Sequence, residues 1–248
     1  MGKSNNLNED LDPVYYTAPI ELWQEFLDSP LNVLEDVLAY ASAKYNTKEV
    51  ASNKLNVKYD EWENTYAKGK ELRELGYCGV NFSISQELYW DYRNNGKKKT
   101  EYDNLLLLAY LALNSMRGNL TFTNSLFWFS RMAGYGSMDS FRSLWEKRDR
   151  KTGKVGYYSN RRIAKYVKSK QILCRTCAKL RLDLMIKFPH VHFYSEQGKR
   201  DFAFMFDSKR SRQECMDELA ELMHQRGITT HRDALKEMMM QARQKTSK

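Results

Sequence analysis

The stretch SNRRIAKYVKSKQILCRTCAKLRLDLMIKFPHVHFYSEQGKRDFAFMFD, residues 159–207, has the most specific order of elements in the chain. Ser159 or Asn160 can cap a helix at its start, and Pro189 stops a longer helix further on. Two runs rich in aromatic and β-branched residues follow, joined by a basic connection. A helix is predicted over 161–167, a break over 170–173 and a longer helix over 175–188. Two strands are predicted over 191–194 and 201–207.

Two further helical segments precede this stretch. Residues 101–116 are apolar on nearly every face, and Thr100 or Asp103 can cap them, so a buried central helix is expected there. Helices over 124–133 and 137–148, separated by a glycine turn, would form a second helical corner. This second corner offers three basic residues, Arg142, Lys147 and Arg148.

The order of helix, turn, longer helix and hairpin with a basic tip resembles a winged helix-turn-helix domain over about residues 101–207. Such domains occur in bacterial regulators and plasmid replication initiators. The resemblance implies that the longer helix lies in the major groove of DNA and that the hairpin contacts a phosphate or the minor groove. The expected fold class is mainly α with a small β-hairpin wing: a helical N-terminal part and a winged helix-turn-helix-like basic domain.

The same resemblance assigns DNA contacts to ten residues. The reading helix of the family maps onto Arg175, Thr176, Lys179 and Arg181. The wing maps onto Lys199 and Arg200, next to Gly198. Phosphate contacts are expected from Arg161, Arg162, Lys165 and Lys168. Apolar residues crowd the second half of the reading helix, so only its first half is expected to face DNA. The second corner, over 124–148, is an alternative candidate for reading DNA.

The positive charge of the chain is concentrated after residue 96. Residues 1–96 carry 9 Lys and Arg against 16 Asp and Glu, whereas residues 97–248 carry 31 against 15. Residues 147–181 hold thirteen basic residues and one acid, Asp149. Such a field favours a polyanionic partner, and double-stranded DNA is the one expected. An interaction scaffold whose basic face binds RNA or an acidic protein is the alternative from a different class.

The charge step also predicts a division into parts. Residues 1–96 are expected to form an acidic helical region, disordered over 1–12, residues 97–213 the DNA-binding domain, and residues 214–248 a C-terminal helical hairpin. Predicted helices of the first region cover 20–27, 31–45, 48–55 and 59–75, and a flexible boundary covers 94–99. The first region or the methionine-rich C-terminal helices could contact a protein partner or a second copy.

Composition points to a cytoplasmic protein without a membrane partner. The longest apolar run is far shorter than a membrane span, and the N-terminus lacks a signal pattern. Four cysteines in 248 residues do not make a disulfide framework, so reduced thiols are expected.

Two histidine patterns raise the question of a metal. Cys174 and Cys177 precede His190 and His192 in C-x2-C-x12-H-x-H spacing, but histidines two residues apart do not suit a structural zinc site. Residues 189–193, PHVHF, also resemble the His-hydrophobic-His motif of endonucleases that start rolling-circle replication and conjugative transfer. There the histidines hold a divalent metal while a tyrosine attacks a phosphate. The tyrosine is absent from its usual place and no third ligand is evident. No cofactor and no enzymatic activity are therefore expected, and a metal-dependent DNA-nicking enzyme is the alternative.

Overall fold

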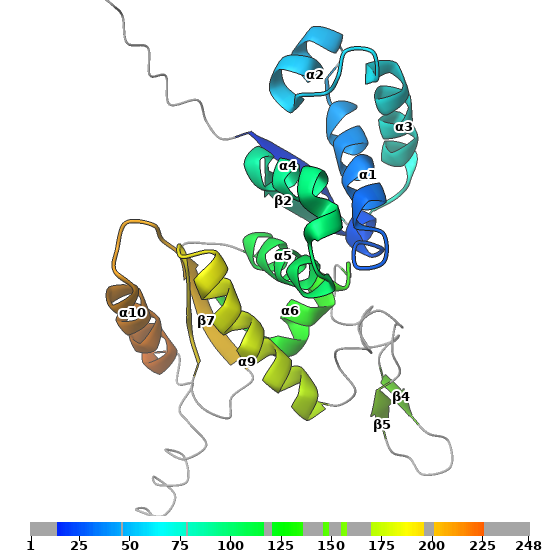
Figure 1. Cartoon of the computed structure of the whole chain (residues 1–248). Coiled ribbons are helices and arrows are strands. Elements are labelled where there is room, and N and C mark those ends of the chain that lie inside the picture. The colour runs from blue at the N-terminus through cyan, green and yellow to red at the C-terminus, as the bar shows by residue number, and fades with distance from the viewer. Residues whose placement is uncertain are drawn as a thin grey trace, which may run out of the picture. The chain divides into compact units, whose positions relative to one another are not determined.

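The computed structural model is mainly helical, as predicted, with small antiparallel sheets (Figure 1). By its internal contacts the chain divides into unit 1, Met1–Lys99, and unit 2, Thr100–Lys248. The structure describes residues 14–45, 47–77, 79–116, 121–135, 146–148, 155–157, 170–195 and 201–225. The segments expected to be disordered over 1–12 and helical at the C-terminal end beyond residue 225 lie outside these ranges.

Unit 1 combines a two-stranded sheet with helices. Its elements in order are β1 (Tyr15–Pro19), the 3-10 turn η1 (Ile20–Trp23), α1 (Pro30–Ser42), α2 (Lys48–Leu55), α3 (Trp62–Glu74), β2 (Asn81–Ser85), α4 (Gln86–Asn95) and the 3-10 turn η2 (Gly96–Lys98). Strands β1 and β2 pair antiparallel, with Tyr15 opposite Ser85 and Pro19 opposite Asn81. The N-terminal part is thus mainly helical, and the two-stranded sheet is an addition that the sequence analysis did not predict.

Two local expectations in unit 1 also need correction. The helix expected over 20–27 is only the turn η1 followed by hydrogen-bonded turns. The boundary expected to be flexible over 94–99 is helical through η2, and the Lys99 Nζ atom lies 2.5 Å from the Asp91 Oδ2 atom. This ion pair and the α4 backbone order the segment. Its polar composition alone had suggested a flexible linker.

The core of unit 1 is aromatic, and its tyrosines satisfy backbone carbonyls. The Tyr16 hydroxyl donates to the Leu55 carbonyl at 2.8 Å, and the Tyr89 hydroxyl donates to the Leu34 carbonyl at 2.9 Å. Trp90 donates from Nε1 to the Tyr16 hydroxyl at 3.0 Å. Buried phenols need such partners, so these bonds tie β1 to α2 and α4 to α1 and β1.

Helices α1 and α3 pack at unusually close range where Gly69 faces Ala39. A Cβ atom built on Gly69 would lie 2.0 Å from the Ala39 carbonyl oxygen and 2.8 Å from the Ala43 Cβ atom. Glycine at this position is therefore required by the approach of the two backbones.

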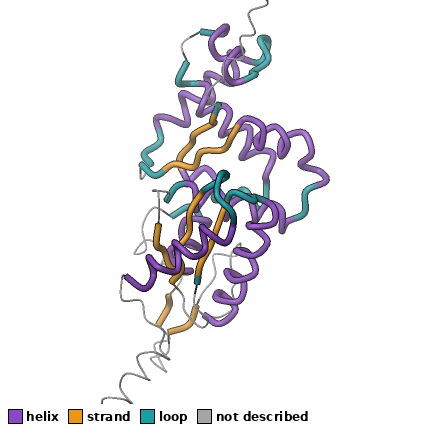
Figure 2. The backbone as a smooth tube through the Cα atoms, turned by 90° about the vertical axis from the view of Figure 1, so that its left-hand side faces the viewer, coloured by secondary structure: helices purple, strands orange, loops and turns teal. Residues whose placement is uncertain are grey.

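Unit 2 contains a three-stranded sheet, helices on both of its faces and a separate short hairpin. Its described elements are α5 (Glu101–Asn114), β3 (Thr121–Asn124), α6 (Ser125–Met132), β4 (Glu146–Arg148), β5 (Val155–Tyr157), α9 (Lys170–Lys187), β6 (Val191–Tyr194), β7 (Asp201–Phe206) and α10 (Arg212–Gln225). The strands lie in the order β3-β7-β6, all antiparallel, and are orange in Figure 2.

The central helix α5 behaves as the sequence predicts. Thr100 and Asp103 form a capping box at its start, and Leu105, Leu107 and Leu111 are among its many buried residues. The indole of Trp128 in α6 donates to the Ala109 carbonyl at 3.0 Å, which fastens α6 to α5.

A second layer covers the other side of the sheet. In Figure 1, β7 lies between α10 and the helices α5, α6 and α9. Phe202, Ala203, Phe204 and Met205 of β7 are all buried. One cluster joins Ala203 and Met205 to residues of α10, namely Cys215, Leu219 and Met223. The sheet is thus buried on both faces along its central strand.

The second helical corner needs one correction. The last three residues of the helix expected over 137–148 form a strand, because Glu146–Arg148 pairs antiparallel with Val155–Tyr157 as β4 and β5. Residues 136–145, including Arg142, lie outside the described ranges. A second helix that extends to Arg148 is therefore excluded.

Candidate nucleic-acid interface

The candidate reading helix, α9, is longer than expected. It runs without interruption from Lys170 to Lys187, so the break predicted over 170–173 does not exist. That segment contains neither glycine nor proline, and nothing in it ends a helix. The preceding segment with Arg161, Arg162, Lys165 and Lys168 lies outside the described residues. Arg175 stands in the second turn of α9, but its side chain is not among those described.

One face of α9 builds the core of unit 2. Cys177, Leu180 and Leu184 are completely buried and lie three or four residues apart, on one face of the helix. Helix α9 packs on α5, α6 and β6 through its buried side. The Cys177 Sγ atom lies 3.9 Å from the Ser125 carbonyl oxygen, and its burial identifies it as a packed thiol of α9.

Lys179, one of the predicted reading residues, lies at the α5 side of the helix. Its side chain is exposed, and its Nζ atom lies 4.8 Å from the centre of the Tyr102 ring. The Tyr102 hydroxyl donates to Asp183, one turn further along α9. Burial and this hydrogen bond hold the pKa of Tyr102 well above its usual range, so the phenol stays protonated. The Lys179 ammonium therefore lies over an uncharged ring, and it could leave this ring to contact a phosphate.

The last turns of α9 are fixed to the N-terminus of α5 by charge. Lys187 Nζ lies 3.0 Å from Asp103 Oδ1, and the Thr100 backbone donates to Asp103 Oδ2 at 3.0 Å. The hydrogen bonds from Thr100, helped by Lys187, lower the pKa of Asp103 to about 2. Lys187 is thus engaged in holding the two helices together.

Arg181, another predicted reading residue, points to the sheet. Its guanidinium carbon lies 4.8 Å from the centre of the Phe202 ring in β7, and its Nη2 donates to the Ser195 Oγ atom at 3.2 Å. Arg181 and Thr176 are both half-buried. The structure therefore separates Arg181 from Lys179, and the described contacts of Arg181 are those of a residue that positions α9 on the sheet.

The remaining face of α9 is exposed and mostly aliphatic. Leu182 is 57% exposed and Ile186 is 78% exposed, and Ala178 is exposed as well. These three residues stand at intervals of four, so they form a line along the helix next to Lys179. Sequence reasoning noticed the apolar residues of this half but did not predict which of them would face outward.

The two strands predicted over 191–194 and 201–207 pair as a hairpin. Strands β6 and β7 pair antiparallel, with Val191 opposite Phe206 and Tyr194 opposite Ala203. Residues 196–200, which include the predicted contacts Lys199 and Arg200, lie outside the described ranges.

The two histidines contact protein groups. His192 is buried, and its Nε2 lies 2.9 Å from the Asp207 carbonyl oxygen, which requires a proton on that nitrogen. His190 Nε2 lies 3.2 Å from the Tyr110 hydroxyl, a contact that sequence reasoning missed. Burial first, and then His192, lowers the pKa of His190, so His190 does not add to the positive field near neutral pH. Among the described residues no group of three or more His, Cys, Asp or Glu could hold a metal ion.

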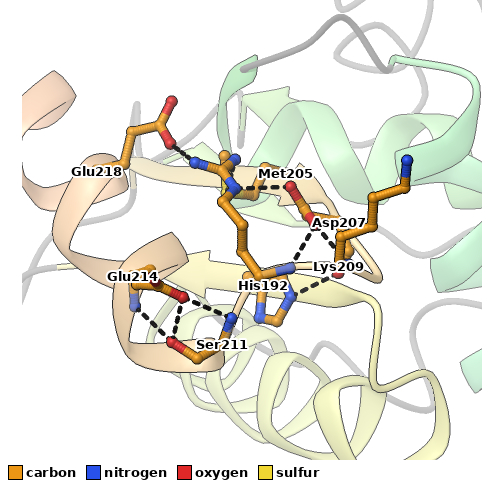
Figure 3. Close-up of polar contacts among 8 residues, drawn as sticks. His192, Met205, Asp207, Lys209, Ser211, Glu214 and Glu218 are labelled. Atoms are coloured by element: carbon orange, nitrogen blue, oxygen red, sulfur yellow. Dashed lines mark hydrogen bonds and ion pairs between the residues drawn. The ribbon is translucent and has the colours of Figure 1, made fainter.

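Polar contacts fix the turn from β7 into α10 (Figure 3). Asp207 accepts hydrogen bonds from the backbone of Lys209 and Arg210 and from the Arg210 side chain. These bonds, first of all that from the Arg210 backbone, lower the pKa of Asp207. Ser211 and Glu214 then form reciprocal bonds at the start of α10. This network holds α10 in place behind the sheet.

The surface of unit 1 has a groove in which acidic and basic side chains are paired. A groove of about 270 Å³ between α1 and α3 is lined by charged residues that include Glu35, Glu61, Lys68 and Arg93. Arg93 pairs with Glu35 at 2.7 Å, and Lys68 pairs with Asp36 at 2.5 Å. Because carboxylates neutralise both cations, this groove does not favour phosphates.

The chain matches no protein-family model, no curated protein and no solved structure. Its function must therefore be inferred from its own residues. In the described part of the chain, no helix combines the length and the apolar character needed to cross a bilayer.

Proposed function

We propose that unit 2 binds double-stranded DNA as a winged-helix-type domain, with α9 in the major groove and the β6–β7 hairpin as its wing. One observation supports this above the others: α9 is followed directly by an antiparallel hairpin whose connection contains Lys199 and Arg200. The charge agrees with it, because residues 97–213 carry 25 basic residues against 9 acidic ones.

The contacts of the described side chains divide the predicted DNA-binding residues into two roles. Lys179 is exposed and can reach a phosphate or a base edge. Arg181 stacks on Phe202 and bonds Ser195, so in this proposal it positions α9. Arg161, Arg162, Lys165, Lys168, Lys199 and Arg200 are the proposed phosphate contacts, with Arg175 and Thr176 near the groove. A regulator or a replication initiator of a bacterial mobile element is the biological role that this proposal suits.

Binding of the full chain to duplex DNA over a series of salt concentrations tests the proposal. Affinity should fall steeply with salt, and Lys179→Ala should weaken binding and reduce the slope of log K against log salt by about 0.9 if Lys179 contacts one phosphate. Lys54→Ala removes an exposed cation of unit 1 and serves as the matched control, with no change expected.

Three results would contradict the proposal. A flat salt dependence would remove its electrostatic basis, and tighter binding to RNA than to duplex DNA would favour the scaffold alternative. Cleavage of single-stranded DNA that requires manganese and is lost in His192→Ala would favour the nicking enzyme.

A further inference from the structure

The exposed face of α9 has an unusual composition for a surface helix in a basic unit. Ala178, Leu182 and Ile186 form one aliphatic line, and the two large side chains are 57% and 78% exposed. Helix α9 packs mainly on α5, α6 and β6, with a further contact from Arg181 to Phe202 of β7, and the buried residues Cys177, Leu180 and Leu184 lie on another side of the helix. The line therefore faces outward in the described structure.

Charge decides what can cover this face. Lys179 lies beside the aliphatic line, and the one carboxylate of α9, Asp183, is bonded to Tyr102. Thirteen basic residues and one acid occupy residues 147–181, which include the first half of the helix. A second copy of α9 would bring like charges together, whereas a polyanion with apolar groups would match both features.

The major groove of DNA has such groups. Thymine presents a C5-methyl group there, and aliphatic side chains make apolar contact with it, whereas recognition of guanine usually needs an Arg or Lys fork. Arg181 is the described arginine of α9, and it stacks on Phe202 at the sheet. Among the described side chains of α9, the exposed face thus offers aliphatic groups and the ammonium of Lys179 to the groove.

We propose that Ala178, Leu182 and Ile186 select thymine-containing sites by packing on thymine methyl groups, with Lys179 contacting the adjacent backbone or base edge. This inference rests on the proposed function, because it requires α9 to enter the major groove. It extends the DNA contact to Leu182 and Ile186 in the second half of α9, whereas the apolar character of that half led the sequence analysis to expect contact by the first half only. It names the feature of the DNA that the site recognises.

Replacement of thymidine by deoxyuridine tests the contact directly, because their bases, thymine and uracil, differ only in the C5-methyl group. A site is first selected by the full chain from a pool of random duplexes. The same site is then synthesised with thymine or with deoxyuridine. The expected loss of affinity on replacement is about fourfold for each contacted methyl, equivalent to ~0.8 kcal/mol.

Variants assign the effect to the helix face. Leu182→Ala and Ile186→Ala should bring the affinity ratio of the two duplexes toward one. Leu75→Ala is the matched control, since Leu75 in unit 1 is 57% exposed, as Leu182 is. It should leave the ratio unchanged. Circular dichroism and sedimentation of each variant show whether its fold and its oligomeric state are retained.

The outcomes separate the two proposals. Salt-dependent binding to duplex DNA with equal affinity for both bases, or selected sites that lack thymine at the protected positions, would overturn this inference and leave the proposed function standing. A change of oligomeric state in Ile186→Ala with an unaltered ratio would show that the face is a protein contact. Absence of duplex binding by the unmodified chain would overturn both.

Discussion

Gly69→Ala should destabilise unit 1, although alanine is the better helix former. In an exposed helix this substitution gains about 1 kcal/mol. Here the new Cβ atom would lie 2.0 Å from the Ala39 carbonyl oxygen and 2.7 Å from the Ala39 carbonyl carbon. Both are backbone atoms of α1, so no side-chain rotation can relieve the contact. Helices α1 and α3 must move apart by more than about 1 Å, which forfeits packing along their whole contact.

The steric cost outweighs the gain in helix propensity. Overpacking of a tight core costs ~1–3 kcal/mol or more, and contact with a backbone places this site at the upper end. We expect a net loss of about 2 kcal/mol in the free energy of unfolding. For a unit of this size that corresponds to a fall in melting temperature of roughly 10 °C.

Thermal unfolding of the full chain, followed by circular dichroism and tryptophan fluorescence, measures this change. Gly76→Ala is the matched control because nothing lies within 4 Å of the Cβ atom it would add. Its effect should stay within about 0.5 kcal/mol. A Gly69→Ala variant that melts at or above the temperature of the unmodified chain would refute the close approach of α1 and α3.

Three further changes follow from contacts in unit 2. Arg181→Ala should lower stability by about 1–2 kcal/mol in denaturant unfolding, since it loses the stacking on Phe202 and a hydrogen bond; unchanged stability with weakened DNA binding would instead make Arg181 a DNA contact. Ser211→Ala should cost ~1 kcal/mol through loss of the α10 cap, and an unaltered melting temperature would contradict that role. Asp103 has a lowered pKa, so its stabilising effect is complete above the ordinary value of 3.8 and is lost as the pH falls toward about 2. The stability of Asp103→Asn, followed during acid titration, should lack the loss that protonation of Asp103 causes. An acid transition identical to that of the unmodified chain would show that the Asp103 carboxylate does not stabilise the fold.

Elements with strong local signals were predicted well from sequence. The helix α2, the capped start of α5, and the strands β6 and β7 all depend on residues close together in the chain. Strand β2 lacks such a signal. Its alternation of Phe82 and Ile84 spans five residues, and its partner β1 lies more than sixty residues earlier, so no local pattern reveals the pair.

The candidate site shows the same limit at the level of side chains. Arg181 and Lys179 are two residues apart, and both look like DNA contacts when charge alone is considered. Their positions differ in the structure. The Arg181 guanidinium stacks on Phe202 of β7 and is half-buried, whereas the Lys179 ammonium lies over Tyr102 of α5 and stays exposed. Helix α9 also carries two apolar lines, one through Leu180 and Leu184 and one through Leu182 and Ile186. Only tertiary packing decides which line is buried.

The place of β3 in the sheet has a consequence for synthesis of the chain. Thr121 pairs with Phe204, so β3 must wait for a partner made about eighty residues later. At ~5–20 residues per second on the ribosome, this delay is roughly 4–16 seconds. The strands of unit 1, β1 and β2, are both complete before β3 is made. Trp128, whose ring packs against Phe202 of β7, therefore lacks that cover during this interval, and transiently exposed apolar surface of this kind makes a nascent chain prone to aggregation.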